Sequence, residues 1–157
     1  MPRDTPWYEQ VTTPALLRHA RTTYGAAMRQ ALATAGYDDI PKNGLYLIGG
    51  MAFQSEDMPL GNLVRDLRVT KQAAGQLVDT LVTRGYLQRA VDEQDRRKLT
   101  VTLTDRGRAA AVVQTDARKR IDAELLARVR PNDVDITRRT LAALVEIGRR
   151  HEVDDKV

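Results

Sequence analysis

The chain has 157 residues, a formal net charge of +4 and no cysteine, and 42% of its residues are hydrophobic. This hydrophobic share is enough for the core of one globular domain and argues against a disordered chain. The absence of cysteine excludes disulfides, thiolate zinc sites and redox sensing by thiols. Aromatic residues make up only 4% of the chain, so we expect an aliphatic core.

The sequence contains no stretch typical of a membrane span or a secretion signal. Residues 45–53 form the longest nearly apolar stretch, far shorter than the ~20 residues that cross a bilayer. Charged residues among the first ten (Arg3, Asp4 and Glu9) argue against a signal peptide. We therefore expect a soluble, helix-rich cytoplasmic protein with no membrane partner.

Positive charge is concentrated in the middle third of the chain. Residues 61–108 contain ten basic and six acidic side chains, whereas the rest of the chain contains fifteen of each. Such a segment is typical of a surface that binds a polyanion. An ordinary solvated surface would have the same balance, so charge alone leaves both interpretations open.

Two helices are predicted in the first third of the chain. Thr13 is suited to cap the first, Pro14 to be its first helical residue and Gly36 to end it. Apolar residues at helical spacing form an alanine-rich stripe suited to close helix contact: Leu16, Ala20, Tyr24, Ala27, Met28, Ala31 and Ala35. A second helix is predicted over residues 43–51. Its inward face carries Leu45, Ile48 and Met51.

The next two predicted helices are joined by a tight turn. A polar connector at residues 54–59 leads to a short helix at 61–67, and Thr70 is suited to cap a helix over 71–84 that Gly85 ends. The buried face of this last helix comprises Ala74, Leu77, Val78 and Leu81. Its exposed face comprises Lys71, Gln72, Gly75, Gln76 and Asp79. This arrangement is typical of a helix-turn-helix that enters a major groove.

The hydrophobic period then changes to two. Residues 87–91 and 99–103 alternate apolar and polar side chains and predict two strands, joined by the charged loop 92–98. A hairpin directly after a helix-turn-helix predicts a winged helix.

Two helices complete the chain. Thr104 is suited to cap a helix that runs to about residue 130, and Pro131 is suited to begin the last one. Their expected apolar positions are Ala109, Val112, Val113, Ile121 and Leu125, then Val134, Leu141, Leu144, Val145 and Ile147. We expect the polar tail from His151 to fray.

Two stretches carry a family resemblance. The wing reads Asp92, Asp95-Arg96-Arg97-Lys98 and Leu103-Thr104-Asp105-Arg106-Gly107-Arg108. The recognition-helix stretch reads Leu67-Arg68-Val69-Thr70-Lys71, Leu77-Val78-Asp79, Leu81 and Arg84-Gly85-Tyr86-Leu87. Together they resemble the MarR family of winged-helix transcriptional regulators, and the flanking helices extend the resemblance to about residues 10–150.

The resemblance implies a mainly α fold with a small β-hairpin wing. Residues 1–36 would form an N-terminal dimerisation helix, residues 37–103 the winged helix-turn-helix and residues 104–157 the C-terminal dimerisation helices. It also implies a cytoplasmic, nucleoid-associated homodimer of a bacterium or archaeon. This dimer would bind a palindromic operator in double-stranded DNA, usually as a repressor released by a small ligand, with no cofactor.

The sequence departs from the family pattern at two places. Arg68 stands where the family usually has a turn glycine, so either the turn is tighter or a phosphate contact has been gained. Gly75 and Gln76 replace the more usual hydroxyl and arginine residues, so the family's base preference does not carry over.

The recognition helix and the wing contain the candidate DNA contacts. In the helix they are Thr70, Lys71, Gln72, Gly75 and Gln76, where Gln suits adenine and Lys suits guanine or a phosphate. In the wing they are Asp95, Arg96, Arg97 and Lys98. The resemblance makes Arg97 the minor-groove arginine, oriented by Asp95, with Arg96 and Lys98 at phosphates. Further candidate phosphate contacts are Arg65, Arg68 and Arg89.

The resemblance places a ligand pocket between the first, second and fifth helices. The candidate lining residues are His19, Tyr24, Met28, Tyr46 and Met51, which suit an aromatic or amphipathic ligand. Core packing also explains Tyr24, Met28 and Met51, and His19 suits a surface or a dimer interface better. The only histidines, His19 and His151, share no metal-ligand spacing, so we expect no metal site.

No catalytic residue is predicted. The only serine, Ser55, lacks the glycine-flanked turn of a serine nucleophile, and the two glycines at 49–50 do not begin a phosphate loop. Two alternatives to an induced regulator stay open. One is a constitutive DNA-binding or anti-silencing protein of the same fold without an effector, and the other is a protein-interaction module without DNA preference.

Overall fold

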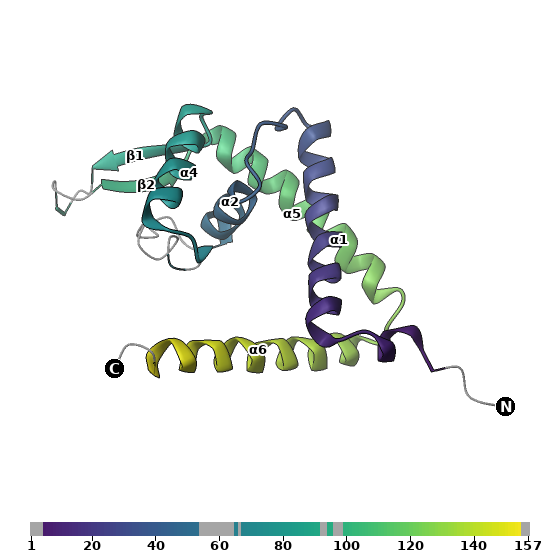
Figure 1. Cartoon of the computed structure of the whole chain (residues 1–157). Coiled ribbons are helices and arrows are strands. Elements are labelled where there is room, and N and C mark those ends of the chain that lie inside the picture. Colours follow the sequence, from purple (N-terminus) through teal and green to yellow (C-terminus); the bar gives the residue numbers. More distant parts are fainter. Residues whose placement is uncertain (1–4, 54–64, 66, 92–93, 96–98, 155–157) are drawn as a thin grey trace. The chain divides into compact units, whose positions relative to one another are not determined.

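The computed structural model describes residues 5–53, 65, 67–91, 94–95 and 99–154 (Figure 1). Its elements are η1 (Trp7–Gln10), α1 (Thr13–Thr34), α2 (Gly44–Phe53), α4 (Lys71–Thr83), β1 (Leu87–Val91), β2 (Leu99–Leu103), α5 (Asp105–Leu126) and α6 (Pro131–Asp154). The chain divides into two compact units, Met1–Arg118 and Lys119–Val157, with the boundary inside α5. The mainly helical fold with one antiparallel hairpin confirms the predicted class. No helix in the described residues is long and apolar enough to cross a membrane.

Helix α1 differs from its prediction by one residue at its start. Its N-cap residue is Thr12 rather than Thr13, so Pro14 is the second helical residue rather than the first. Gly36 follows the helix with φ +85°, a left-handed conformation that glycine adopts without strain. The buried residue of α1 is Leu32, outside the predicted stripe, whose members are half-buried or exposed.

Helices α2 and α4 bury the faces that their spacing predicted. Leu45, Ile48 and Met51 of α2 are buried, with Leu47 in addition. In α4, Ala74, Val78 and Leu81 are buried and Leu77 is half-buried. Most of the predicted connector and short helix over residues 54–67 lies outside the described residues, but Arg65 and Leu67 are helical.

The hairpin has the predicted bounds (Figure 1), and its Leu87, Val101 and Leu103 belong to the core. Leu87 pairs with Leu103 and Val91 with Leu99 in an antiparallel register. Thr104 caps α5 as predicted, because its Oγ1 accepts the Gly107 N–H at 3.0 Å. The core is not purely aliphatic, since Tyr86 lies fully buried in it.

Helix α5 packs on the core through small residues. The helix buries Gly107, Ala110, Ala111, Gln114 and Ala117, whereas the predicted Val112 is 60% exposed. The reason is close packing: a Cβ at position 107 would lie 2.1 Å from the Tyr86 carbonyl oxygen, so only a small residue fits.

The ends of the two C-terminal helices also differ from the prediction. Helix α5 ends at Leu126 rather than near residue 130, and α6 begins at Pro131 as predicted. Helix α6 continues through His151 to Asp154, so the expectation that the chain frays from His151 was wrong.

A polar cluster joins the loop after α1 to α5 through Tyr86, the residue just before β1. The Tyr86 hydroxyl donates to the Asp39 carboxylate, and Arg106 Nη2 donates to both, at 3.0 Å to Tyr86 Oη and 3.3 Å to Asp39 Oδ1. The Arg106 guanidinium also lies 4.7 Å from the centroid of the Tyr86 ring. Burial, followed by the hydrogen bond to Asp39, raises the pKa of Tyr86 to about 12. The hydrogen bond from Tyr86 is the main cause that lowers the pKa of Asp39.

Candidate nucleic-acid interface

Helix α4 presents the predicted polar face to solvent. Thr70 is its N-cap residue, and its side-chain oxygen accepts the Ala73 N–H at 3.1 Å. The buried face fixes the rotation of the helix about its axis, so the opposite side points outward. That side carries Thr70, Lys71, Gln72 and Gln76, all exposed, and the half-buried Gly75. The structure thus brings these five predicted residues onto one surface, which we call the α4 face.

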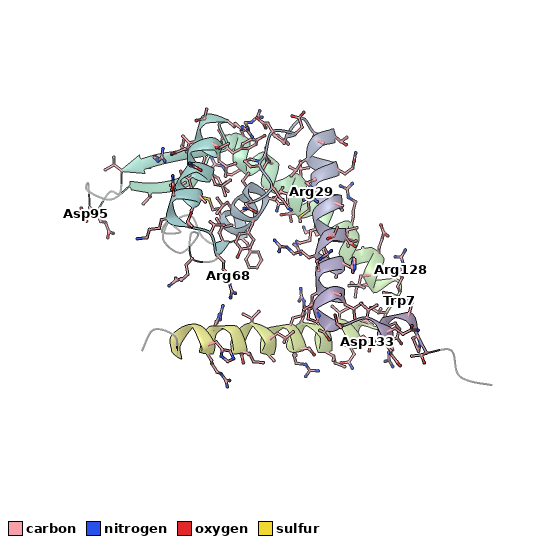
Figure 2. All side chains as sticks on the ribbon, in the orientation of Figure 1. Trp7, Arg29, Arg68, Asp95, Arg128 and Asp133 are labelled. Carbon is pink, nitrogen blue, oxygen red and sulfur yellow. The ribbon has the colours of Figure 1, made fainter. Side chains whose placement is uncertain are left out.

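The turn before α4 contains an unusual backbone conformation. Arg68 has φ +50°, in the left-handed region that L-residues rarely adopt. Its N–H donates to the Arg65 carbonyl oxygen at 3.3 Å. Both arginine side chains are exposed, and Figure 2 shows Arg68 projecting from the N-terminal end of α4. The predicted phosphate contacts at 65 and 68 therefore lie at the edge of the α4 face.

The wing is described only in part. Its two strands have the predicted register. The exposed Asp95 lies in the loop that connects them (Figure 2). The other predicted wing contacts, Arg96, Arg97 and Lys98, lie outside the described residues.

Arg89 of β1 has an internal partner that the sequence did not reveal. Its Nη2 donates to the carboxylate of Asp79 on α4, in an ion pair whose side chains are 41% and 62% exposed. The pair joins the wing strand to the recognition helix. The positive charge of this predicted phosphate contact is thus already balanced within the chain. The alternating pattern of β1 assigns Arg89 to a face of the strand, and helical spacing assigns Asp79 to a face of α4. Neither pattern indicates that these two faces meet.

The predicted ligand residues differ in their exposure. His19 and Tyr46 are exposed, Tyr24 and Met28 are half-buried, and Met51 belongs to the buried core. A cavity of about 230 Å³ lies beside the C-terminal part of α1, and none of these residues lines it. It is lined by Arg29, Leu32, Ala33, Tyr37, Asp38, Ile40 and Leu45. Within the described residues, no cluster of three or more His, Asp or Glu side chains is placed to hold a metal ion.

Gln114 is a buried polar residue that the sequence analysis missed. Its Nε2 donates to the Leu45 carbonyl oxygen at 2.9 Å across the contact between α5 and α2. Its Oε1 is buried without a hydrogen-bond partner. A Cβ at Gly49 would lie 2.6 Å from Nε2, so the Gln114 amide would have to shift to admit any other residue. The sequence offered one signal, a polar residue on the alanine-rich side of α5.

Comparison with known proteins places the fold. No protein-family model matches the chain, and no curated protein sequence does. Streptococcus pneumoniae FabT, solved in complex with DNA, has a TM-score of 0.74 and 18% identity, over 91% of this chain and 98% of that one.

Two further solved structures are similar. Staphylococcus aureus MepR in its DNA-binding conformation has a TM-score of 0.71 and 18% identity, over 87% of this chain and 98% of that one. Mycobacterium tuberculosis Rv1404 has a TM-score of 0.64 and 26% identity, over 87% of this chain and 90% of that one. These three proteins are MarR-family regulators. The chain therefore has the winged-helix fold of the MarR-family transcriptional regulators, as the motifs of its wing and recognition helix predicted.

Proposed function

We propose that the chain is a sequence-specific transcriptional regulator that binds double-stranded DNA. The observation that carries this proposal is the α4 face. A capped helix, fixed by buried Ala74, Val78 and Leu81, presents a cation and two amides outward. Glutamine and lysine side chains can hydrogen-bond to base edges in the major groove, and the capped end of the helix is the end that enters it.

The similar solved structures support this proposal. FabT was solved in complex with DNA, and MepR was solved both in a DNA-binding conformation and as a DNA complex. In our proposal the α4 face enters the major groove, and Arg97 of the wing reaches the adjacent minor groove, where narrow A·T tracts attract arginine. No catalytic role is proposed for any residue.

We further propose that the regulator acts as a homodimer on a palindromic operator, as a repressor. The exposed apolar residues of α6 favour association with a second copy: Ile136, Leu141, Leu144, Val145 and Ile147. Large exposed apolar patches on soluble proteins often mark interaction sites. Two-fold symmetry would place the recognition helices in successive major grooves, ~34–36 Å apart.

Release by a small aromatic or amphipathic ligand completes the proposal. The cavity beside α1 combines Arg29, Tyr37 and Asp38 with aliphatic residues, a lining that suits such a ligand. Its volume of about 230 Å³ suits a small ligand only. Thermal shift against phenols and aromatic carboxylates tests this part. A ligand that raises the Tm and lowers DNA affinity supports release, whereas no shift at millimolar ligand favours a constitutive DNA-binding protein.

Fluorescence anisotropy tests the DNA-binding proposal directly. The purified protein would be titrated onto genomic fragments that it selects, and onto scrambled duplexes of equal length, at two salt concentrations. We expect a preference of at least ~10³ for a palindromic fragment, with affinity that falls steeply in salt. A Gln72→Ala, Gln76→Ala variant should lose the preference but keep the salt dependence. Equal, weak binding to every duplex would contradict a sequence-specific regulator and leave an interaction module.

A further inference from the structure

Arg68 occupies a backbone conformation that glycine would adopt more easily. Among the described residues, it is the only non-glycine residue with positive φ, at +50°. The other positive-φ positions, Gly36 at +85° and Gly85 at +76°, follow the ends of α1 and α4. An L-residue is strained in the left-handed region because its Cβ crowds the following carbonyl oxygen, and glycine has no Cβ. A glycine at position 68 would therefore make this turn more stable.

The strained turn lies where a duplex would meet the protein. Thr70, two residues after Arg68, caps α4, so the turn leads directly into the α4 face. The Arg68 side chain is exposed and projects from this end of the helix (Figure 2). The first turn of a helix has backbone N–H groups without intrahelical partners and a partial positive charge, both of which favour a phosphate. Exposed Arg65 and Lys71 add positive charge on either side.

We propose that Arg68 anchors a DNA phosphate and that the chain retains its strained backbone for this contact, at a cost in fold stability. The inference rests on the proposed function, since its ligand is a phosphate of duplex DNA. Strain of this kind persists where the side chain contributes to function rather than to folding. The left-handed backbone also sets the direction of the side chain, because Cβ leaves the chain differently there than in a helical or extended residue.

Two substitutions separate the strain from the side chain. Arg68→Gly and Arg68→Ala both remove the guanidinium and every contact that it makes, but only glycine relieves the left-handed strain. We expect the glycine variant to melt about 2–4 °C above the alanine variant. At an exposed position without backbone strain, the glycine variant would melt at the same temperature as the alanine variant or below it. The order of the two Tm values therefore reports the strain directly.

DNA binding is measured on the same variants by fluorescence anisotropy across a salt series. Each variant should lose about one phosphate contact per protomer, which lowers the slope of log K against log salt by ~0.9. At 0.1 M salt this corresponds to roughly eightfold weaker binding per protomer, equal on palindromic and scrambled duplexes. Arg68→Lys keeps both the charge and the strain, so its slope and Tm should match the wild type.

Each contrary result has a distinct meaning. A wild-type salt slope in Arg68→Gly, or a reduced slope in Arg68→Lys, would overturn the phosphate contact. Weaker binding confined to the palindrome would indicate that Arg68 contacts a base rather than a phosphate, and would overturn the proposed phosphate contact. A glycine variant that melts no higher than the alanine variant would overturn the strain. Absence of any palindrome preference in the wild type would instead contradict the proposed function, while the salt slopes would still test the anchor.

Discussion

Replacing Tyr86 with phenylalanine removes one hydroxyl from the cluster that joins three parts of the winged-helix unit. The ring itself stays buried among the core residues, so the substitution leaves no large cavity. The hydroxyl donates to the Asp39 carboxylate and accepts from Arg106 at 3.0 Å, and both contacts are lost. The Tyr86→Phe variant therefore isolates the polar part of this contact.

The expected loss is about 1–2 kcal/mol in the free energy of unfolding. A hydrogen bond to a charged group contributes about 1.5–3 kcal/mol. The lower part of that range applies because the side chains of Asp39 and Arg106 are 40% and 43% exposed, so water can replace part of the lost contact. For a chain of this size, that loss lowers the Tm by roughly 2–8 °C.

Urea unfolding followed by circular dichroism measures this difference, and Tyr46→Phe is the matched control. Tyr46 is half exposed on α2, so removal of its hydroxyl costs little stability. We expect the free energy of unfolding to change by no more than about 0.5 kcal/mol. A Tyr86→Phe variant as stable as the control would refute the assigned role of the cluster.

The same variant has a predicted signature at high pH. Folded Tyr86 keeps its proton to a pKa of about 12, whereas the unfolded side chain releases it near its ordinary value of 10.0. Stability that is fully present below pH 10 is therefore lost as the pH rises from 10 towards 12. Tyr86→Phe lacks this titration, so the wild-type advantage should shrink over this window. A constant difference between the two proteins from pH 8 to pH 12 would contradict the raised pKa.

Three further predictions concern other contacts. Asp79→Arg and Arg89→Asp should each weaken palindrome binding in the anisotropy assay. If the ion pair positions the wing, the double variant should recover this binding. No recovery would show that Arg89 contacts DNA itself. Gln114→Met removes the buried oxygen without a partner and should unfold at equal or slightly higher urea concentration, whereas Gln114→Glu should lose about 3 kcal/mol or more. Gly75→Ala and Gly50→Ala should both raise the Tm, because a Cβ meets no atom within 4 Å at either position, but only the former should change DNA affinity.

Many elements of the winged helix could be predicted from local patterns in the sequence. Thr70 and Thr104 were identified as helix caps, and the bounds of both strands match the structure. The buried side of α4 follows from its apolar spacing. These features depend on residues within a few positions of one another, where capping chemistry and hydrophobic period act directly.

The face that each helix buries depends on its partners. In α5 the apolar spacing singled out valine and isoleucine, whereas the close approach to Tyr86 and α2 buries glycine and alanine. Met51, predicted to face inward and also proposed for a ligand pocket, lies in the core. Apolar spacing identifies residues that can be buried, but not which of them contact a ligand or a second copy.

By itself, the sequence determined the order of the elements, the caps of α4 and α5, the exposed face of the recognition helix and the resemblance to one family of regulators. Only the tertiary structure decided that Asp79 pairs with Arg89, that Asp39 and Arg106 meet at Tyr86, and that Arg68 has a left-handed backbone. For the ion pair and the Tyr86 cluster, the reason is distance along the chain, since residues ten to sixty-seven positions apart meet only after folding. For Arg68 the reason is that its residue type disfavours the conformation that the surrounding fold imposes.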